Sequence, residues 1–208
     1  MTTTVILLTD IQGLLFDLDG TLISTLSVTE QIYRDLAHQH KIDPQPVIDF
    51  CHEYAKELEL QAVDQLSGLT VIDGARELVN GLKKGTWAIF TSGLPMLAVP
   101  RMQYLGVPVP EVLVTPVDVD KGKPFADGYL LAAKKIGKNV ARCLVFEDAE
   151  AGIVSGVRAG ALVIGIRTLL DHSTLCNAGA TYTVKDMTKV RVIYTETGSM
   201  TVEIDQSD

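Results

Sequence analysis

The sequence predicts an α/β fold built on a doubly wound, Rossmann-like parallel sheet. Short, continuous apolar runs alternate with segments of helical periodicity over most of the 208 residues. Continuous apolar runs are typical of parallel strands that are covered on both faces, and β-α alternation implies right-handed crossovers between them. Residues 22–69 interrupt this alternation with two helical segments, which predicts a small helical cap inserted after the first strand.

The apolar runs are the expected strands, and the periodic segments between them are the expected helices. The strands span residues 13–18, 87–92, 111–115, 143–148 and 161–166, and the helices span 74–84, 94–105, 124–136 and 149–160. Pro95 suits the first turn of its helix, where a backbone N–H has no helical partner, and Gly160 suits a helix C-terminus. A Thr-Gly turn between two β-rich runs predicts a C-terminal β-hairpin over 190–204.

The cap prediction rests on two helix-start signals. Ser27-Val28-Thr29-Glu30 has the pattern of a capping box and predicts a helix to about His40. Asp43-Pro44 predicts the start of a second helix, whose apolar stripe is Val47, Cys51, Tyr54 and Leu58. Residues 22–69 are therefore the expected cap, and residues 1–21 and 70–208 are the expected core.

Composition limits the classes of partner. The net charge of −8 comes without a basic cluster that could neutralise nucleic-acid phosphates, so no nucleic-acid partner is expected. The apolar run TTTVILL lacks a positively charged flank and is too short to span a bilayer, so neither a signal peptide nor a membrane is expected. The cysteines, Cys51, Cys143 and Cys176, match no metal-binding spacing, and reduced thiols indicate the cytoplasm.

Two carboxylates follow the first expected strand, in the stretch LLFDLDGTLIS. Asp17 and Asp19 project to the same side of an extended chain, so they share one site, and Gly20 permits a sharp turn directly after them. A solvated, Asp-rich turn is the plain alternative. An EF-hand loop is poorly supported, because the residues after Thr21 lack the glycine and the middle ligands of such a loop.

Polar residues also follow three later strands. Thr91 and Ser92 can donate to a phosphate at the start of a helix, Lys123 can reach back as a point charge, and Glu147-Asp148 offer hard oxygen ligands for Mg²⁺. Alone, each has an ordinary structural explanation as a helix cap, an exposed lysine or a first-turn carboxylate. Together they occupy the carboxyl ends of successive strands, which is where open α/β sheets bind ligands.

These four groups of residues resemble the motifs of the haloacid-dehalogenase-like phosphatase superfamily. The matching stretches are DLDGT, FTSG, GKP and FEDAEAG, and the similarity covers nearly the whole chain. The subgroup that the sequence most resembles contains small-cap sugar phosphatases, glycerol-phosphate phosphatases, deoxyglucose-phosphate phosphatases and β-phosphoglucomutase. Relative to that subgroup, the inserted cap is shortened by about one helical hairpin.

The resemblance implies a role for each motif residue. Asp17 is implied as the nucleophile that forms an aspartyl-phosphate, and Asp19 as the general acid and base. Mg²⁺ is implied as the cofactor, held by Asp17, the backbone carbonyl of Asp19 and Asp148, with Glu147 orienting the metal shell. Thr91, Ser92 and Lys123 are implied to bind the phosphate, and Gly20 and Thr21 to support the first motif.

The expected activity is Mg²⁺-dependent hydrolysis of a small phosphorylated metabolite, a sugar or polyol phosphate. One alternative is β-phosphoglucomutase-like phosphoryl transfer, which requires a cap that re-presents the intermediate. Another is a non-catalytic relic with a reduced cap, although all four motifs are intact. The protein is expected to be a monomer or a weak homodimer.

Overall fold

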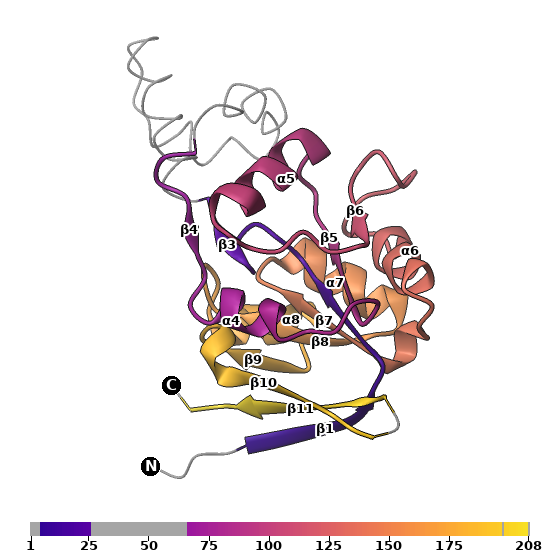
Figure 1. Cartoon of the computed structure of the whole chain (residues 1–208). Helices are drawn as coiled ribbons and strands as arrows, with labels where there is room; N and C mark the ends of the chain where they lie inside the picture. The colour runs from indigo at the N-terminus through magenta and orange to yellow at the C-terminus, as the bar shows by residue number, and fades with distance from the viewer. Residues whose placement is uncertain (1–4, 26–65, 197, 208) are drawn as a thin grey trace.

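The computed structural model describes residues 5–25, 66–196 and 198–207 (Figure 1). Its main feature is a six-stranded sheet of order β6-β5-β2-β7-β8-β9 in which every neighbouring pair is parallel. The strands are β2 (Gly13–Phe16), β5 (Trp87–Phe90), β6 (Leu113–Val114), β7 (Cys143–Glu147), β8 (Leu162–Ile166) and β9 (Tyr182–Val184). The predicted α/β class is confirmed. The five expected strands are present, and β9 extends the sheet beyond them.

The order of the strands fixes where a ligand can bind. From β2 the chain moves outward through β5 and β6, then returns to the other side of β2 and continues through β7, β8 and β9. The direction of winding therefore reverses between β2 and β7. In open α/β sheets a ligand binds at such a switch point, in the crevice beyond the carboxyl ends of the strands.

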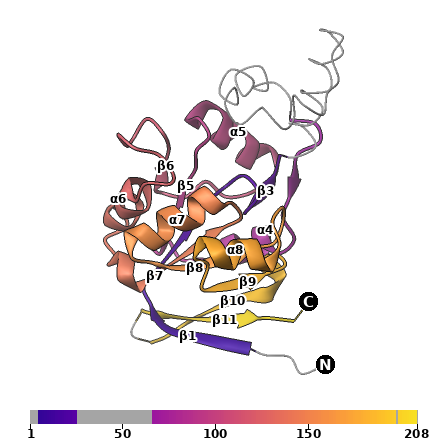
Figure 2. The ribbon, with the colours of Figure 1, turned by 180° about the vertical axis from the view of Figure 1, so that it is seen from behind.

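Helices cover both faces of this sheet. They are α4 (Ala75–Asn80), α5 (Pro95–Tyr104), α6 (Asp127–Lys135), α7 (Glu150–Ala159) and α8 (His172–Ala178), with short 3₁₀ turns η1 (Val140–Arg142) and η2 (Met187–Lys189). Alternate strand residues face opposite sides, so Phe16 packs with residues of α4 and α5, whereas Leu15 packs with residues of α6, α7 and α8. Figure 2 shows α6, α7 and α8 together on one side. No helix in the described part of the chain has both the length and the apolar character needed to cross a membrane.

A second, antiparallel sheet of order β1-β11-β10 packs below the first in Figure 1. Its strands are β1 (Val5–Ile11), β10 (Val190–Tyr194) and β11 (Met200–Asp205), and the predicted C-terminal hairpin is β10 with β11. The N-terminal apolar run was not predicted as a strand, yet it forms β1 and pairs with β11. Strand β2, the expected first strand, is therefore the second in the chain.

The two ends of segment 22–69 lie side by side. Strand β3 (Ile23–Ser24) pairs antiparallel with β4 (Thr70–Val71), with Ile23 opposite Val71 and Ser24 opposite Thr70. The backbone N–H of Ile72 also donates to the carbonyl of Leu22 at 3.0 Å. The two helices predicted for the cap lie outside the described residues, so the division into core and cap stays a prediction.

Candidate active site

The two acidic motifs, the first and the fourth along the chain, meet at the switch point of the parallel sheet. Asp17 is the first residue after β2, and Glu147 is the last residue of the neighbouring strand β7. The register places Phe16 opposite Phe146, and the N–H of Asp17 donates to the carbonyl of Phe146 at 3.0 Å. Pairing of two buried strands therefore brings carboxylates together that are far apart in the sequence.

Gly20 and Thr21 hold the first motif against Asp148. Gly20 has φ +95°, a conformation that side chains disfavour, and a Cβ there would lie 2.0 Å from the Asp148 Oδ2. The Thr21 hydroxyl donates to the Asp148 Oδ1 at 3.3 Å. Position 20 thus requires glycine for two reasons: the conformation of the turn and the close approach of the Asp148 carboxylate.

Three buried carboxylates form one cluster. Asp17, Glu147 and Asp148 each place an oxygen within 4.8 Å of the others, and they are 6%, 0% and 3% exposed. Burial, together with the charge of Asp17, raises the pKa of Glu147 to about 7 and that of Asp148 to about 8, although the charge of Lys123 lowers both. Within the described residues, the Oδ2 atom of Asp17 is buried without a hydrogen-bond partner.

This cluster fits a divalent metal ion. Crowded carboxylate oxygens are the ligands that hard divalent cations prefer, and such a cation would remove the repulsion among them. The unpartnered oxygen of Asp17 is a further acceptor that a cation would satisfy. The side chain of Asp19 lies outside the cluster, and the predicted use of its backbone carbonyl as a ligand stays a prediction.

Lys123 joins the cluster from the loop before α6. Its ammonium group forms ion pairs with Asp17 and, at 2.5 Å, with the Glu147 Oε1. Burial alone would lower the pKa of Lys123, but the charges of Asp17 and Glu147 outweigh it and hold that pKa well above its usual value. The lysine therefore remains charged inside the site, where it can stabilise negative charge.

Tyr129 is a residue of this network that sequence reasoning missed. Its hydroxyl, fully buried on α6, donates to the Glu147 Oε1 at 2.7 Å. Gly152 on α7 makes room for the same glutamate, because a Cβ there would lie 1.9 Å from the Glu147 Cδ. Burial, followed by the negative charge of Glu147, raises the pKa of Tyr129 well above its usual value, so the hydroxyl stays a donor.

The loop after β5 lies beside Asp19. Thr91 is buried, and its hydroxyl accepts a hydrogen bond from the N–H of Gly93 at 2.9 Å. Ser92 is exposed. A Cβ at Gly93 would lie 3.5 Å from the Asp19 Oδ2, so this loop and the second carboxylate of the first motif are close together. The binding of phosphate by Thr91 and Ser92 stays a prediction.

Arg101 is the second residue that sequence reasoning missed. It lies on α5, is 6% exposed, and its Nη1 atom donates to the Asp19 Oδ1 at 3.3 Å. Helical periodicity places it on the same face as the buried residues Leu97, Ala98 and Met102. The only signal in the sequence was a charged residue on an otherwise apolar stripe.

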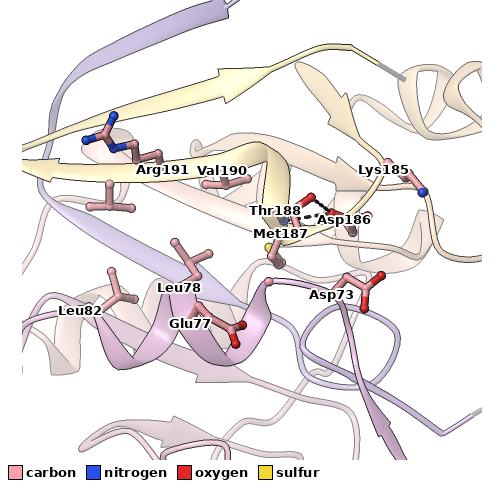
Figure 3. Close-up of a pocket in the computed structure, with 13 residues that line it drawn as sticks. Asp73, Glu77, Leu78, Leu82, Lys185, Asp186, Met187, Thr188, Val190 and Arg191 are labelled. Atoms are coloured by element: carbon pink, nitrogen blue, oxygen red, sulfur yellow. Dashed lines mark hydrogen bonds between the residues drawn. The ribbon is translucent and has the colours of Figure 1, made fainter.

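A groove of about 770 Å³ lies between α4 and segment 185–192, and none of the predicted site residues lines it (Figure 3). Leu78 and Val190 contribute apolar surface, whereas Glu77 and Arg191 contribute charges of opposite sign. The Asp186 carboxylate here accepts hydrogen bonds from the N–H and hydroxyl of Thr188. It therefore caps η2.

Comparison with known proteins agrees with this geometry. A family profile described as haloacid dehalogenase-like hydrolase matches residues 11–160, which include all four motifs. This chain belongs to the haloacid dehalogenase-like hydrolases. A hydrolase of this family from Entamoeba histolytica has a similar solved structure, with a TM-score of 0.75 and 25% identity over 87% of this chain and 96% of that one.

Curated relatives of this haloacid dehalogenase-like hydrolase include several phosphatases. Hexitol phosphatase A of Escherichia coli is 35% identical over 188 residues, which cover 79% of this chain and 87% of that protein. 2-Deoxyglucose-6-phosphate phosphatase 2 of Saccharomyces cerevisiae is 33% identical over 230 residues, which cover 91% of this chain and 94% of that protein. The chain is a phosphoric monoester hydrolase of this family.

Proposed function

We propose that this enzyme uses Mg²⁺ to hydrolyse the phosphate monoester of a small sugar or polyol. The buried cluster of Asp17, Glu147, Asp148 and Lys123 at the switch point of the sheet carries the proposal, because it combines a nucleophile, metal ligands and a cation. The named activities of the relatives support a sugar or polyol as the alcohol. The free thiols of Cys143 and Cys176 support the expected cytoplasmic location.

In the first step a carboxylate oxygen of Asp17 attacks phosphorus. The bond between phosphorus and the alcohol oxygen breaks, its electron pair stays on that oxygen, and Asp19 supplies the proton that completes the alcohol. Lys123, which pairs with Asp17, stabilises charge on the phosphoryl oxygens. The hydroxyls of Thr91 and Ser92 are assigned to the same oxygens.

In the second step water attacks the phosphorus of the aspartyl-phosphate. Asp19, now a carboxylate, accepts a proton from this water, and the bond between phosphorus and Asp17 breaks to give free phosphate. When bound, Mg²⁺ would be held by Asp17, Asp148 and the carbonyl of Asp19, and it would supply positive charge that offsets the repulsion between the carboxylates and the phosphate. Glu147 orients this shell through its bonds to Lys123 and Tyr129.

A screen of phosphorylated sugars and polyols with Mg²⁺, with free phosphate as the readout, tests the proposal. We expect hydrolysis by the wild type and by Asp120→Asn, an exposed control, and none above background by a folded Asp17→Asn. Formation of sugar-phosphate isomers without free phosphate would show that the enzyme is a mutase and not a hydrolase. A wild type that hydrolyses neither these substrates nor p-nitrophenyl phosphate would overturn the proposal in favour of a non-catalytic relic.

A further inference from the structure

The burial of Arg101 requires an explanation. Charged side chains are almost never fully buried unless they are paired, and this one is 6% exposed on the core-facing side of α5. Within the described residues, its Nε atom is buried without a hydrogen-bond partner, which lowers stability. An apolar residue at this position would avoid that loss. Stability alone therefore does not account for an arginine here.

The pairing of Arg101 with Asp19 provides the explanation. The Asp19 side chain is 27% exposed, whereas that of Arg101 is 7% exposed, so a buried guanidinium contacts a more accessible carboxyl group. The contact is to Oδ1, and Oδ2 lies on the side of Gly93, near the loop that is assigned to the phosphate. Arg101 thus holds one oxygen of Asp19, and the other lies on the side of the loop that is assigned to the phosphate.

We propose that Arg101 is a positioning residue for Asp19, a role that rests on the proposed function. With Oδ1 accepting from the guanidinium, Oδ2 carries the proton toward the departing alcohol oxygen. As the bond between phosphorus and that oxygen breaks, the proton moves from Oδ2 to the oxygen, and Asp19 is left as a carboxylate that still accepts from Arg101. A planar guanidinium fixes a carboxyl group in a way that a flexible ammonium does not.

The dependence of the rate on the leaving group separates this role from a purely structural one. Nitrophenolate departs without a proton, phenolate benefits from one, and an alkoxide requires one. The kcat/KM value reports the step that transfers the phosphoryl group to Asp17, in which the alcohol departs. Loss of a positioned acid therefore lowers kcat/KM more for poorer leaving groups, whereas general loss of structure lowers it equally for all.

The experiment measures kcat/KM of Arg101→Met with Mg²⁺ on p-nitrophenyl phosphate, phenyl phosphate and glycerol phosphate. We expect kcat/KM to fall at least about ten-fold more on phenyl phosphate and on glycerol phosphate than on p-nitrophenyl phosphate. A general acid contributes about 10²–10⁴-fold to the rate. Arg101→Lys keeps the charge but not the planar guanidinium. It should show the same preferential loss on the poorer leaving groups, to a smaller degree. It also serves as the test if Arg101→Met does not fold.

Arg76→Met is the matched control. The Arg76 guanidinium donates to the Leu105 carbonyl at the end of α5, at 2.5 Å, and it therefore also ties down this helix. We expect this variant to change kcat/KM by the same factor on all three substrates. Equal losses on all substrates in both Arg101 variants, or no loss, would overturn the positioning role and leave the proposed function intact. A wild type inactive on every substrate would overturn both.

Discussion

The hydrogen bond from Tyr129 to Glu147 offers a single-atom test of the candidate site. Tyr129→Phe removes one hydroxyl whose surroundings are fully buried, so water cannot replace it. A hydrogen bond to a charged group contributes about 1.5–3 kcal/mol. Glu147 keeps its bond to Lys123, so we expect a loss of about 2 kcal/mol. For a chain of this size that corresponds to a fall in Tm of about 4–8 °C.

The same variant should slow catalysis, because Glu147 is assigned to orienting the metal shell. Loss of such a supporting partner typically lowers activity by about 10–100-fold. Thermal unfolding followed by circular dichroism and kcat/KM for phosphate release, both with excess Mg²⁺, measure the two effects. Tyr194→Phe is the control. The Tyr194 side chain lies on β10, in the antiparallel sheet, and its hydroxyl accepts from the Lys83 N–H at 2.7 Å. Wild-type Tm and kcat/KM in Tyr129→Phe would refute the reasoning.

Other predictions concern packing, pH and reactivity. Gly152→Ala places a Cβ 1.9 Å from the Glu147 Cδ, so denaturant unfolding should show a loss of about 3 kcal/mol or more, against a small change for Gly81→Ala. In metal-free protein, the folded-state pKa values of Glu147 and Asp148, about 7 and about 8, exceed those of the unfolded chain. The folded state therefore holds extra protons, and denaturation at pH 5 and pH 8 with chelator should show lower stability at pH 8, with Mg²⁺ reducing the difference. Burial raises the pKa of Cys143 to about 12, so peptide mapping should find this thiol unalkylated by iodoacetamide at pH 8 until the protein is unfolded.

The parallel sheet was predictable because its signals are local. Each of the five expected strands is a continuous apolar run that ends on polar residues, as in the stretch from Leu14 to Asp19, whereas the short strand β9 has no such run. The rule that ligands bind at the carboxyl ends of such strands then brought four distant motifs to one place. The ion pairs of Lys123 with Asp17 and Glu147 show how directly that rule applies here.

Other features depend on contacts that a local pattern does not contain. Strand β1 pairs with β11 at the opposite end of the chain, so its short apolar run had no visible partner. The helix expected over 74–84 ends at Asn80, because from Leu82 the backbone N–H donates to the carbonyl three residues earlier, that of Val79, and the α-helical pattern stops. Arg101 and Tyr129 lie on core-facing helix positions, and periodicity gives the direction of a side chain but not the polar group opposite it.

The short ladder between β3 and β4 places Ser24 and Thr70, which flank residues 25–69 in the sequence, opposite each other. Because Ser24 and Thr70 are neighbours, the chain leaves the two-stranded sheet of β3 and β4 and returns to it at one point, whatever number of residues comes between. Doubling the length of such a loop changes its closure entropy by only about 0.6 kcal/mol. The yeast relative aligns over 230 positions, more than the 208 residues of this chain, so it contains residues that are missing here. Residues can therefore be added or removed between these two strands at a small entropic cost while Ile23 keeps its pairing with Val71.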